Sequence, residues 1–274
     1  PIHGVVISNV VIRNSWCTGL LRFLPARGYP IDGVHVSNIQ MLETHGRSEA
    51  HAVLKFGNTK SGMPRSEYMP FDPCPPEDQA NITIENVFVK DWVGPFIVVL
   101  EPVKNLTIRG VRGNHTGPLL HNYGQAIDGL TLEDCRVDLT GAHDEPFVGP
   151  MMQFCMEEWG LDTTSRDGTP AAIILNKGPL KDVDIRNVVL TSQLEPDDMV
   201  TGSGVAGVRL GPDAQVQSLR ISKLTIDGYE AGVIVEDGVQ GEDLRFQDIT
   251  MRNVATPWKI KNANRQTASM EISP

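Results

Sequence analysis

The sequence predicts an all-β solenoid, in which the 274 residues coil into about eight stacked rungs of short parallel strands. An eight-residue frame predicts the strands: apolar and variable residues alternate, a turn residue follows, and the alternation then resumes. The last copy of this frame is residues 244–251, with Asp248 at its turn position. Where no insertion intervenes, successive turn positions such as Asn86 and Gly110 lie 24 residues apart, a spacing typical of solenoids.

The frame recurs along the whole chain, and its turn position favours a left-handed backbone. Seven of the eight turn residues are Asn, Asp or Gly, for which a positive φ is least costly. Only Gly113 breaks the rule that the four alternating slots are apolar. Two short strands are therefore expected to meet at each of eight bends, which are Asn9, Asn38, Asn86, Gly110, Asp134, Asn187, Lys223 and Asp248.

Each rung contains a third apolar segment after the bent pair. Three strands per rung would stack into three parallel sheets around a narrow core. Stacking would also satisfy the backbone groups that a single rung leaves open. The third segments are residues 19–23, 52–56, 96–100, 119–121, 172–175, 207–210, 232–235 and 258–260.

Two of the motifs resemble those of the right-handed parallel β-helices of the pectin-lyase-like superfamily. Residues 32–39 (DGVHVSNI) and 81–87 (NITIENV) are similar to that family's second strand, tight asparagine bend and third strand. The resemblance covers nearly the whole chain, and it concerns the fold more than the activity. It implies that the third segment of each rung belongs to the family's first sheet, whose outer face is the floor of the substrate groove in the family's enzymes.

We expect a single domain spanning residues 1–274, with loop insertions at 57–79, 141–170 and 192–203. All three insertions would border the outer face of the first sheet, and solenoids commonly place insertions on their binding face. The alternative is that loops collect wherever the turns are permissive. Within the second insertion, residues 150–159 are apolar enough to predict a short helix beside the groove.

Composition limits the partners. The net charge of −10 argues against nucleic acid, although the same charge also serves solubility. No stretch approaches the ~18 apolar residues of a membrane helix, and residue 1 leads directly into a strand rather than a signal peptide. Cys17, Cys74, Cys135 and Cys155 have no metal-ligand spacing, and Cys135 is expected in the core.

The first predicted rung has no covering helix, and an uncovered end would be an adhesive sheet edge. We therefore expect either an N-terminal cap preceding this sequence or a homo-oligomer that covers the rung. The expected location is secreted, periplasmic or at the cell surface.

Strand alternation predicts a series of basic side chains on the outer face of the first sheet. Arg22 and Lys55 belong to consecutive rungs, so their backbones are expected roughly 5 Å apart. A basic series in an acidic protein is typical of a site for an anionic chain; the alternative is an ordinary solvated surface. The series consists of Arg22, Lys55, His121, Lys177, Arg209 and Lys259.

Two chemistries suit a uronic-acid polymer. In β-elimination a base removes the C5 proton while cations neutralise the carboxylate, and Lys or Arg is a suitable base when its pKa is lowered. Hydrolysis needs two carboxylates, ~6.5–9.5 Å apart in an inverting enzyme. Glu101 and Glu236 are expected four rungs apart, roughly 19 Å, so a hydrolytic pair would need insertion residues such as Asp72.

The catalytic motifs of the family's known polygalacturonases and pectate lyases are absent from this sequence. Residues 258–261 and 71–74 match polygalacturonase and alginate-epimerase motifs only faintly. No metal or other cofactor is expected; residues 195–198 are a candidate calcium loop, although a solvated loop is the favoured interpretation. The expected catalytic residues are Lys55, Arg22, His121 and Glu101, and the expected substrate-binding residues are Arg209, Lys177, Lys259, Tyr68, Trp159 and Asp72.

The favoured hypothesis is a lyase or glycoside hydrolase that cleaves a uronate-containing polysaccharide in the first-sheet groove. Insertions bordering one face favour an enzyme. The alternative is a non-catalytic carbohydrate-binding or structural β-helix module, of the tailspike or adhesin type. The missing catalytic motifs and the uncovered first rung favour this alternative.

Overall fold

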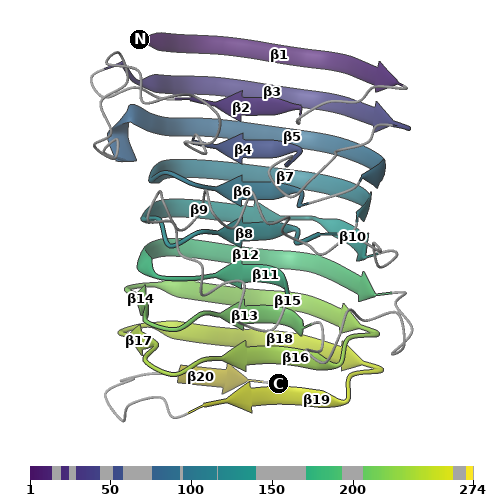
Figure 1. Ribbon diagram of the computed structural model, residues 1–274, viewed down its shortest axis with the longest axis vertical. Helices are drawn as coiled ribbons and strands as arrows, with labels where there is room; N and C mark the ends of the chain where they lie inside the picture. The colour runs from purple at the N-terminus through teal and green to yellow at the C-terminus, as the bar shows by residue number, and fades with distance from the viewer. Residues whose placement is uncertain are drawn as a thin grey trace, which may run out of the picture.

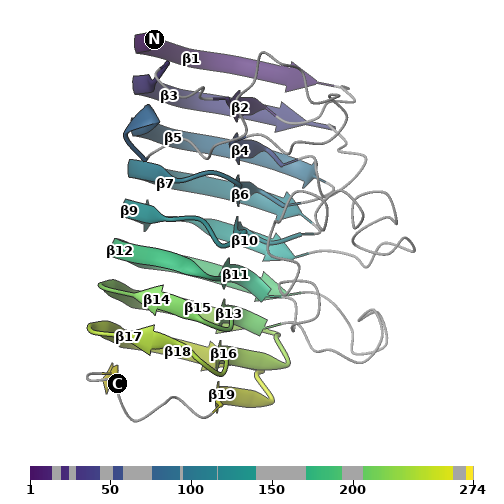
Figure 2. The ribbon, with the colours of Figure 1, turned by 60° about the vertical axis from the view of Figure 1, so that its left-hand side comes forward.

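The computed structural model describes residues 1–13, 20–24, 29–43, 52–57, 76–92, 95–115, 117–139, 171–192, 206–261 and 270–273. These residues form an all-β structure in which two parallel sheets extend along the stack, an arrangement typical of a β-solenoid (Figure 1). The rungs follow one another in chain order, with β1 at one end and β19 at the other (Figures 1 and 2). Within this described part, no helix is long and apolar enough to cross a membrane.

Within the described residues, the larger sheet has twelve strands, and nine of them lie in the order β1-β3-β5-β7-β10-β12-β15-β18-β20. The strands β9, β14 and β17 pair beside this path, and the 3-10 turn η1 (Pro76–Asp78) leads into β5. The bounds are β1 (Ile2–Arg13), β3 (Ile31–Leu42), β5 (Gln79–Trp92), β7 (Val103–His115), β9 (Ile127–Glu133), β10 (Arg136–Leu139), β12 (Gly178–Ser192), β14 (Ala214–Val216), β15 (Leu219–Asp227), β17 (Gln240–Gly241), β18 (Leu244–Arg252) and β20 (Met270–Ser273).

Eight strands of the described chain form the smaller sheet, in the order β19-β16-β13-β11-β8-β6-β4-β2. All eight overlap the third apolar segments, so the prediction that these segments are strands is confirmed. The pairing is parallel and joins residues at like positions, as in Leu21 with Leu54. The bounds are β2 (Leu21–Phe23), β4 (Leu54–Phe56), β6 (Ile97–Val99), β8 (Leu120–Asn122), β11 (Ala171–Leu175), β13 (Ala206–Leu210), β16 (Ala231–Val235) and β19 (Thr256–Ile260).

All eight predicted bends have a left-handed backbone, with φ between 51° and 69°. Asparagine side chains at the first three bends form a hydrogen-bonded ladder: Asn38 Nδ2 donates to Asn9 Oδ1 at 3.2 Å, and Asn86 Nδ2 donates to Asn38 Oδ1 at 3.2 Å. On the next rung Gly110 takes the place of an asparagine, and a Cβ there would lie 2.9 Å from Asn86 Oδ1. The ladder thus stabilises the bend from rung to rung.

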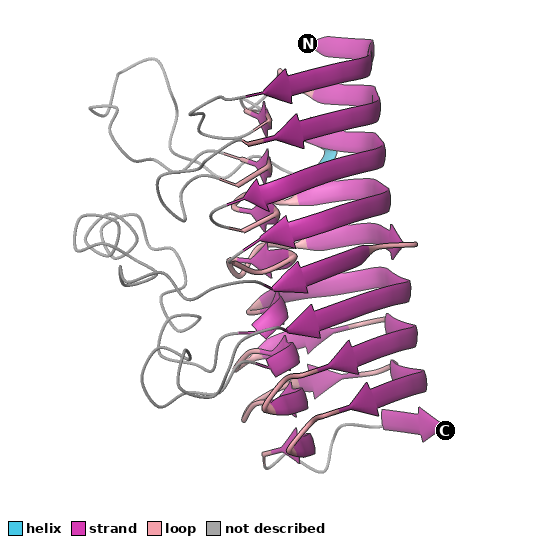
Figure 3. Ribbon diagram, turned by 90° about the vertical axis from the view of Figure 1, so that its right-hand side faces the viewer, coloured by secondary structure: helices cyan, strands magenta, loops and turns pink. Residues whose placement is uncertain are grey.

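A second series of left-handed residues lies five positions before the first, which the sequence prediction missed. Asn81 and Asn105 belong to it, with φ values of 53° and 51°. Asn81 Nδ2 donates to Asp32 Oδ1 at 2.6 Å, and Asn105 Nδ2 donates to Asn81 Oδ1 at 2.9 Å. Long strands such as β5 and β7 therefore turn twice, and Figure 3 shows the long strands bending round one side of the stack.

The core lies between the two sheets. Ile84 and Ile185, predicted to point inward, are fully buried. Cys135 is buried as predicted, and this burial raises the pKa of its thiol to about 12. Gly113 is the one position that breaks the apolar rule of the eight-residue frame. A Cβ there would lie 1.7 Å from the Val89 carbonyl oxygen, so only glycine fits.

The three predicted insertions lie almost wholly outside the described residues, and so do residues 150–159 and 195–198. Their ends are nevertheless placed. The first insertion leaves the end of β4 and returns at β5, while the other two connect β10 to β11 and β12 to β13. All three therefore connect to strands of the smaller sheet.

Candidate functional site

Strand register aligns five of the six predicted basic residues in one line across the smaller sheet. This line, here called the outer row, crosses all eight strands of that sheet. Val98, Ile174 and Ile234 of the row belong to small apolar clusters separate from the main core, so the row faces away from the core. The row is Arg22, Lys55, Val98, His121, Ile174, Arg209, Ile234 and Lys259.

Burial corrects one part of the prediction. Arg22 and Lys259, on the two end strands of this sheet, are exposed as expected. Lys55, His121 and Arg209 were expected to face solvent, yet they are only 3%, 4% and 2% exposed. Alternation determines which side of a sheet a residue occupies, but it says nothing about what else lies on that side.

The outer face has apolar side chains of its own. Val98 packs with Leu100 and Tyr123 in one buried cluster, while Ile174 and Ile234 belong to another. The basic residues of the row alternate with these clusters. Cations that would be hydrated on an ordinary surface are therefore held in a largely dehydrated environment.

Among the residues of the outer row, Lys55 is the best candidate for a general base. Burial lowers the pKa of its amine to about 8, and the positive charge of Arg22 on the adjacent strand acts in the same direction. An ammonium with an ordinary pKa would hold its proton throughout the physiological range. Lys55 instead exists partly as a free amine near neutral pH, which is what a general base requires.

His121 is a neutral imidazole in this environment. Burial lowers its pKa to about 3, and the charge of Arg209 adds to the effect. Its ring stacks on Tyr123, with the ring centroids 3.8 Å apart and the planes 20° from parallel. Both ring nitrogens are buried and have no hydrogen-bond partner among the described residues.

Arg209 is held by a carboxylate at the end of the adjacent strand. Its Nε donates to Glu236 Oε1 at 3.3 Å, and Lys261 Nζ lies 2.5 Å from Glu236 Oε2. Burial works to raise the pKa of Glu236, but Lys261 and Arg209 outweigh it and lower the pKa below its ordinary value. The charge of Arg209 is thus compensated within the fold.

The remaining predicted residues are placed as follows. Lys177 is exposed and lies three residues beyond Ile174, so the expectation that it joins the row is wrong. Glu101 follows β6 and lies beside the end of β4, where its backbone N donates to the Phe56 carbonyl at 3.3 Å. Tyr68, Asp72 and Trp159 lie outside the described residues. In the described ranges, no group of three His, Cys, Asp or Glu side chains could hold a metal ion.

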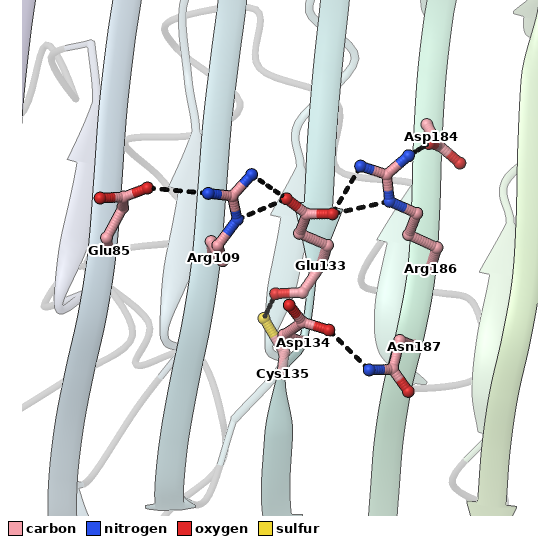
Figure 4. A network of polar contacts seen from close by, with 8 residues as sticks. All are labelled: Glu85, Arg109, Glu133, Asp134, Cys135, Asp184, Arg186 and Asn187. Atoms are coloured by element: carbon pink, nitrogen blue, oxygen red, sulfur yellow. Dashed lines mark hydrogen bonds and ion pairs between the residues drawn. The ribbon is translucent and has the colours of Figure 1, made fainter.

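A second charged row, missed by the sequence prediction, crosses β5, β7, β9 and β12 of the larger sheet (Figure 4). This alternating row consists of Glu85, Arg109, Glu133 and Arg186. Arg109 Nη1 lies 3.1 Å from Glu85 Oε1, and Arg109 also pairs with Glu133 Oε1. Arg186 Nε donates to Glu133 Oε2 at 2.7 Å, and its Nη1 donates to Asp184 Oδ2 at 2.8 Å.

The charges of the alternating row compensate one another. Burial works to raise the pKa of Glu133, but its bonds to Arg186 and Arg109 lower it below the ordinary value. The pKa values of both arginines are raised in turn, chiefly by their hydrogen bonds to Glu133. This row stabilises the stacking of rungs. In the sequence, the residue immediately before each of these four turn positions is charged, and the sign of that charge alternates from rung to rung.

Comparison with family models, curated proteins and solved structures found no match for this chain. Of the two charged rows, the alternating row is internally neutralised, whereas the outer row contains Lys55 and His121, whose pKa values are strongly lowered. The outer row is the candidate functional site.

Proposed function

We propose that the chain is a right-handed parallel β-helix of about eight rungs with three strands per rung, similar to the pectin-lyase-like proteins. The eight aligned strands of the smaller sheet support one strand per rung. The left-handed bends in the long strands support two more, because the pair of bends divides each long strand into segments with different directions.

On this scaffold, we propose that the outer row binds a uronate-containing polysaccharide and that the protein cleaves it by β-elimination. The observation that carries the proposal is the pairing of Arg22 with Lys55 on adjacent strands. One is an exposed guanidinium, the other a buried amine with a lowered pKa, and the protein around them is acidic. A secreted, periplasmic or cell-surface location accompanies this proposal.

The chemistry follows from these two side chains. The Lys55 amine takes the C5 proton of a uronate, the electron pair forms the C4–C5 double bond, and the C4–O bond breaks. The departing oxygen takes a proton from water. Arg22 neutralises the carboxylate, whose negative charge grows as the C5 proton leaves. Hydrolysis has less support, because Glu101 and Glu236 follow strands four rungs apart, roughly 19 Å.

A binding module without catalysis is the second candidate. The burial of Lys55, His121 and Arg209 favours it, because a substrate must reach these groups before they can act. The exposed Arg22 and Lys259 at the two ends of the row would then bind a polyuronate by charge alone.

The test is an incubation with a panel of polyuronates and neutral polysaccharides, followed by ultraviolet absorbance of unsaturated ends and by reducing-end assay. We expect unsaturated products, at a rate that rises with pH through about 8 as Lys55 loses its proton. Lys55→Met should lower the rate by about 100-fold or more. Lys181→Met is the matched control, because Lys181 is an exposed lysine on the larger sheet, 2.9 Å from Asp128.

The outcomes separate the candidates. Reducing ends without unsaturation would overturn the lyase proposal in favour of hydrolysis. Binding of a polyuronate with no products would favour the binding module. Equal rates in Lys55→Met and Lys181→Met would remove Lys55 from the chemistry.

A further inference from the structure

A second line of residues follows the outer row on the same face, two positions further along each strand. Its backbone continues the sheet: Gly211 N donates at 2.8 Å to the carbonyl of Leu175, the residue before Asn176. Tyr123 stacks on His121, and Glu236, two positions beyond Ile234, bonds to Arg209 of the outer row. The line therefore lies on the outer face, and Asn176 holds the same position after β11. Asn176 therefore stands on the outer face, between the rungs of Tyr123 and Gly211.

Two side chains on this face are polar, buried and without a hydrogen-bond partner among the described residues. Asn176 is 0% exposed, and neither its Nδ2 nor its Oδ1 is bonded. The two ring nitrogens of His121 are in the same condition. Buried polar groups in proteins are normally hydrogen-bonded, so each exception calls for a reason, such as a ligand.

These two residues are close enough to meet one ligand. His121 lies on β8, and Asn176 directly follows the adjacent strand β11, two positions further along the strand direction. The strand spacing and the rise per residue place their Cα atoms roughly 8 Å apart. Tyr123, whose ring stacks on His121, stands next to both, so one ligand reaches both side chains across the Tyr123 ring.

Gly211 provides space next to Asn176. A Cβ on Gly211 would lie 2.0 Å from Asn176 Oδ1, so the amide extends over the adjacent rung. The backbone of Gly211 is not left-handed, and its dihedral angles therefore do not require glycine. Glycine is required at position 211 because a side chain there would collide with Asn176. On the far side of Gly211 stands Glu236, bound to Arg209 and Lys261.

The chemistry of the pair selects the ligand. A neutral imidazole offers one donor and one acceptor, and an amide offers two donors and a carbonyl oxygen. Neither side chain contributes a charge for a carboxylate or a phosphate. A hydroxyl group both donates and accepts, so adjacent hydroxyls on a sugar ring match this set.

We propose that His121 and Asn176 form a subsite for the hydroxyl groups of a neutral sugar residue. This inference rests on the proposed polysaccharide binding, and it refines the substrate class. Asn176 is three rungs from Lys55, roughly 14 Å, and Arg22 is one rung further away. The polymer recognised is thus a copolymer, with a uronate at Arg22 and Lys55 and a neutral sugar at His121 and Asn176.

The test uses an array of matched oligosaccharides, in which each uronate homo-oligomer is paired with a copolymer of the same uronate and a neutral sugar. We expect wild-type protein to bind at least one copolymer about 10-fold more tightly than its homo-oligomer. Asn176→Leu should abolish that difference and leave homo-oligomer affinity unchanged. Without ligand, this variant should keep or raise the melting temperature, since it removes two buried polar atoms that lack partners.

Gly211→Ala is the second variant, because its methyl group would lie 2.0 Å from Asn176 Oδ1 and must displace the amide without removing a polar atom. It should also abolish the preference for the copolymer. If no copolymer binds more tightly than its homo-oligomer, the subsite is refuted while polyuronate binding stands. A lower melting temperature in Asn176→Leu with the preference intact would likewise assign Asn176 a structural role. If no uronate oligomer binds but a neutral oligosaccharide binds in an Asn176-dependent way, the proposed function fails and the subsite survives.

Discussion

The two charged rows differ in sign pattern and in burial. In the alternating row, each charge is opposite to that of the next rung, and Arg109 and Arg186 remain about half exposed. In the outer row all the ionisable positions are basic, and Lys55, His121 and Arg209 are buried. Alternation of sign stabilises a stack of rungs, whereas burying groups of one sign destabilises it. Burial lowers the pKa values of Lys55 and His121 in the outer row, and strongly shifted pKa values are typical of functional sites, so this row is the better candidate for function.

The largest expected effect concerns acid. His121 keeps a pKa of about 3 in the fold against an ordinary value of 6.5, so the unfolded chain takes up a proton first as pH falls. Stability is therefore lost as pH falls from 6.5 towards 3, by about 2 kcal/mol between pH 6.5 and 4.5. The His121→Phe variant should not show this loss of stability as pH falls. Urea unfolding of both proteins from pH 7 to 4.5 measures it, and parallel curves would show that His121 is not held neutral.

Lys55→Met should have the next largest effect. The pKa of Lys55 is lowered from 10.5 to about 8, so the fold bears the cost of a buried ammonium below pH 8. We expect the variant to be more stable than wild type by about 1–3 kcal/mol at pH 7. The difference should disappear as pH rises from 8 to 10.5, where the unfolded chain loses its proton too. A variant that is less stable at pH 7 would mean that Lys55 stabilises the fold.

Glu133→Gln tests the alternating row. It should destabilise the fold, whereas Lys55→Met should stabilise it, and the change in stability should be smaller. Removing this carboxylate leaves Arg109 and Arg186 facing each other across one rung, and we expect a loss of about 1–2 kcal/mol. Because both arginines are accessible to ions, the loss should shrink in high salt. Unfolding at low and high ionic strength measures this. The stability gain in Lys55→Met should change less with salt, and equal salt dependence would weaken the comparison.

The fold was predictable because its signals are local. Asn9, Asn38 and Asn86 each set a bend within a frame of eight residues, and the bend needs no knowledge of other rungs. The second series of bends was missed although Gly33, Asn81 and Asp182 are of the same residue types as the first series, because they lie one position before the eight-residue frame.

The site was only half predictable. Alternation within β4 and β13 put Lys55 and Arg209 on the correct face. Burial depends on contacts between rungs, such as that of Val98 with Tyr123, and these contacts are distant in sequence. The alternating row was missed for a similar reason. Glu133 and Arg186 are 53 residues apart, so an insertion must be removed before their signs can be compared.

The central claim is that the outer row, rather than overall charge, binds a polyuronate. Titration calorimetry with polygalacturonate and alginate, at low and at physiological salt, tests it in two double variants. One is Arg22→Ala with Lys55→Met, and the control is Lys104→Gln with Lys181→Gln on the larger sheet. Both lower the net charge of −10 by the same two units.

We expect the first double variant to lose at least about 10-fold in affinity at low salt, with a weaker salt dependence, and the control to bind as wild type does. Equal affinities in the two double variants and in wild type would contradict the claim.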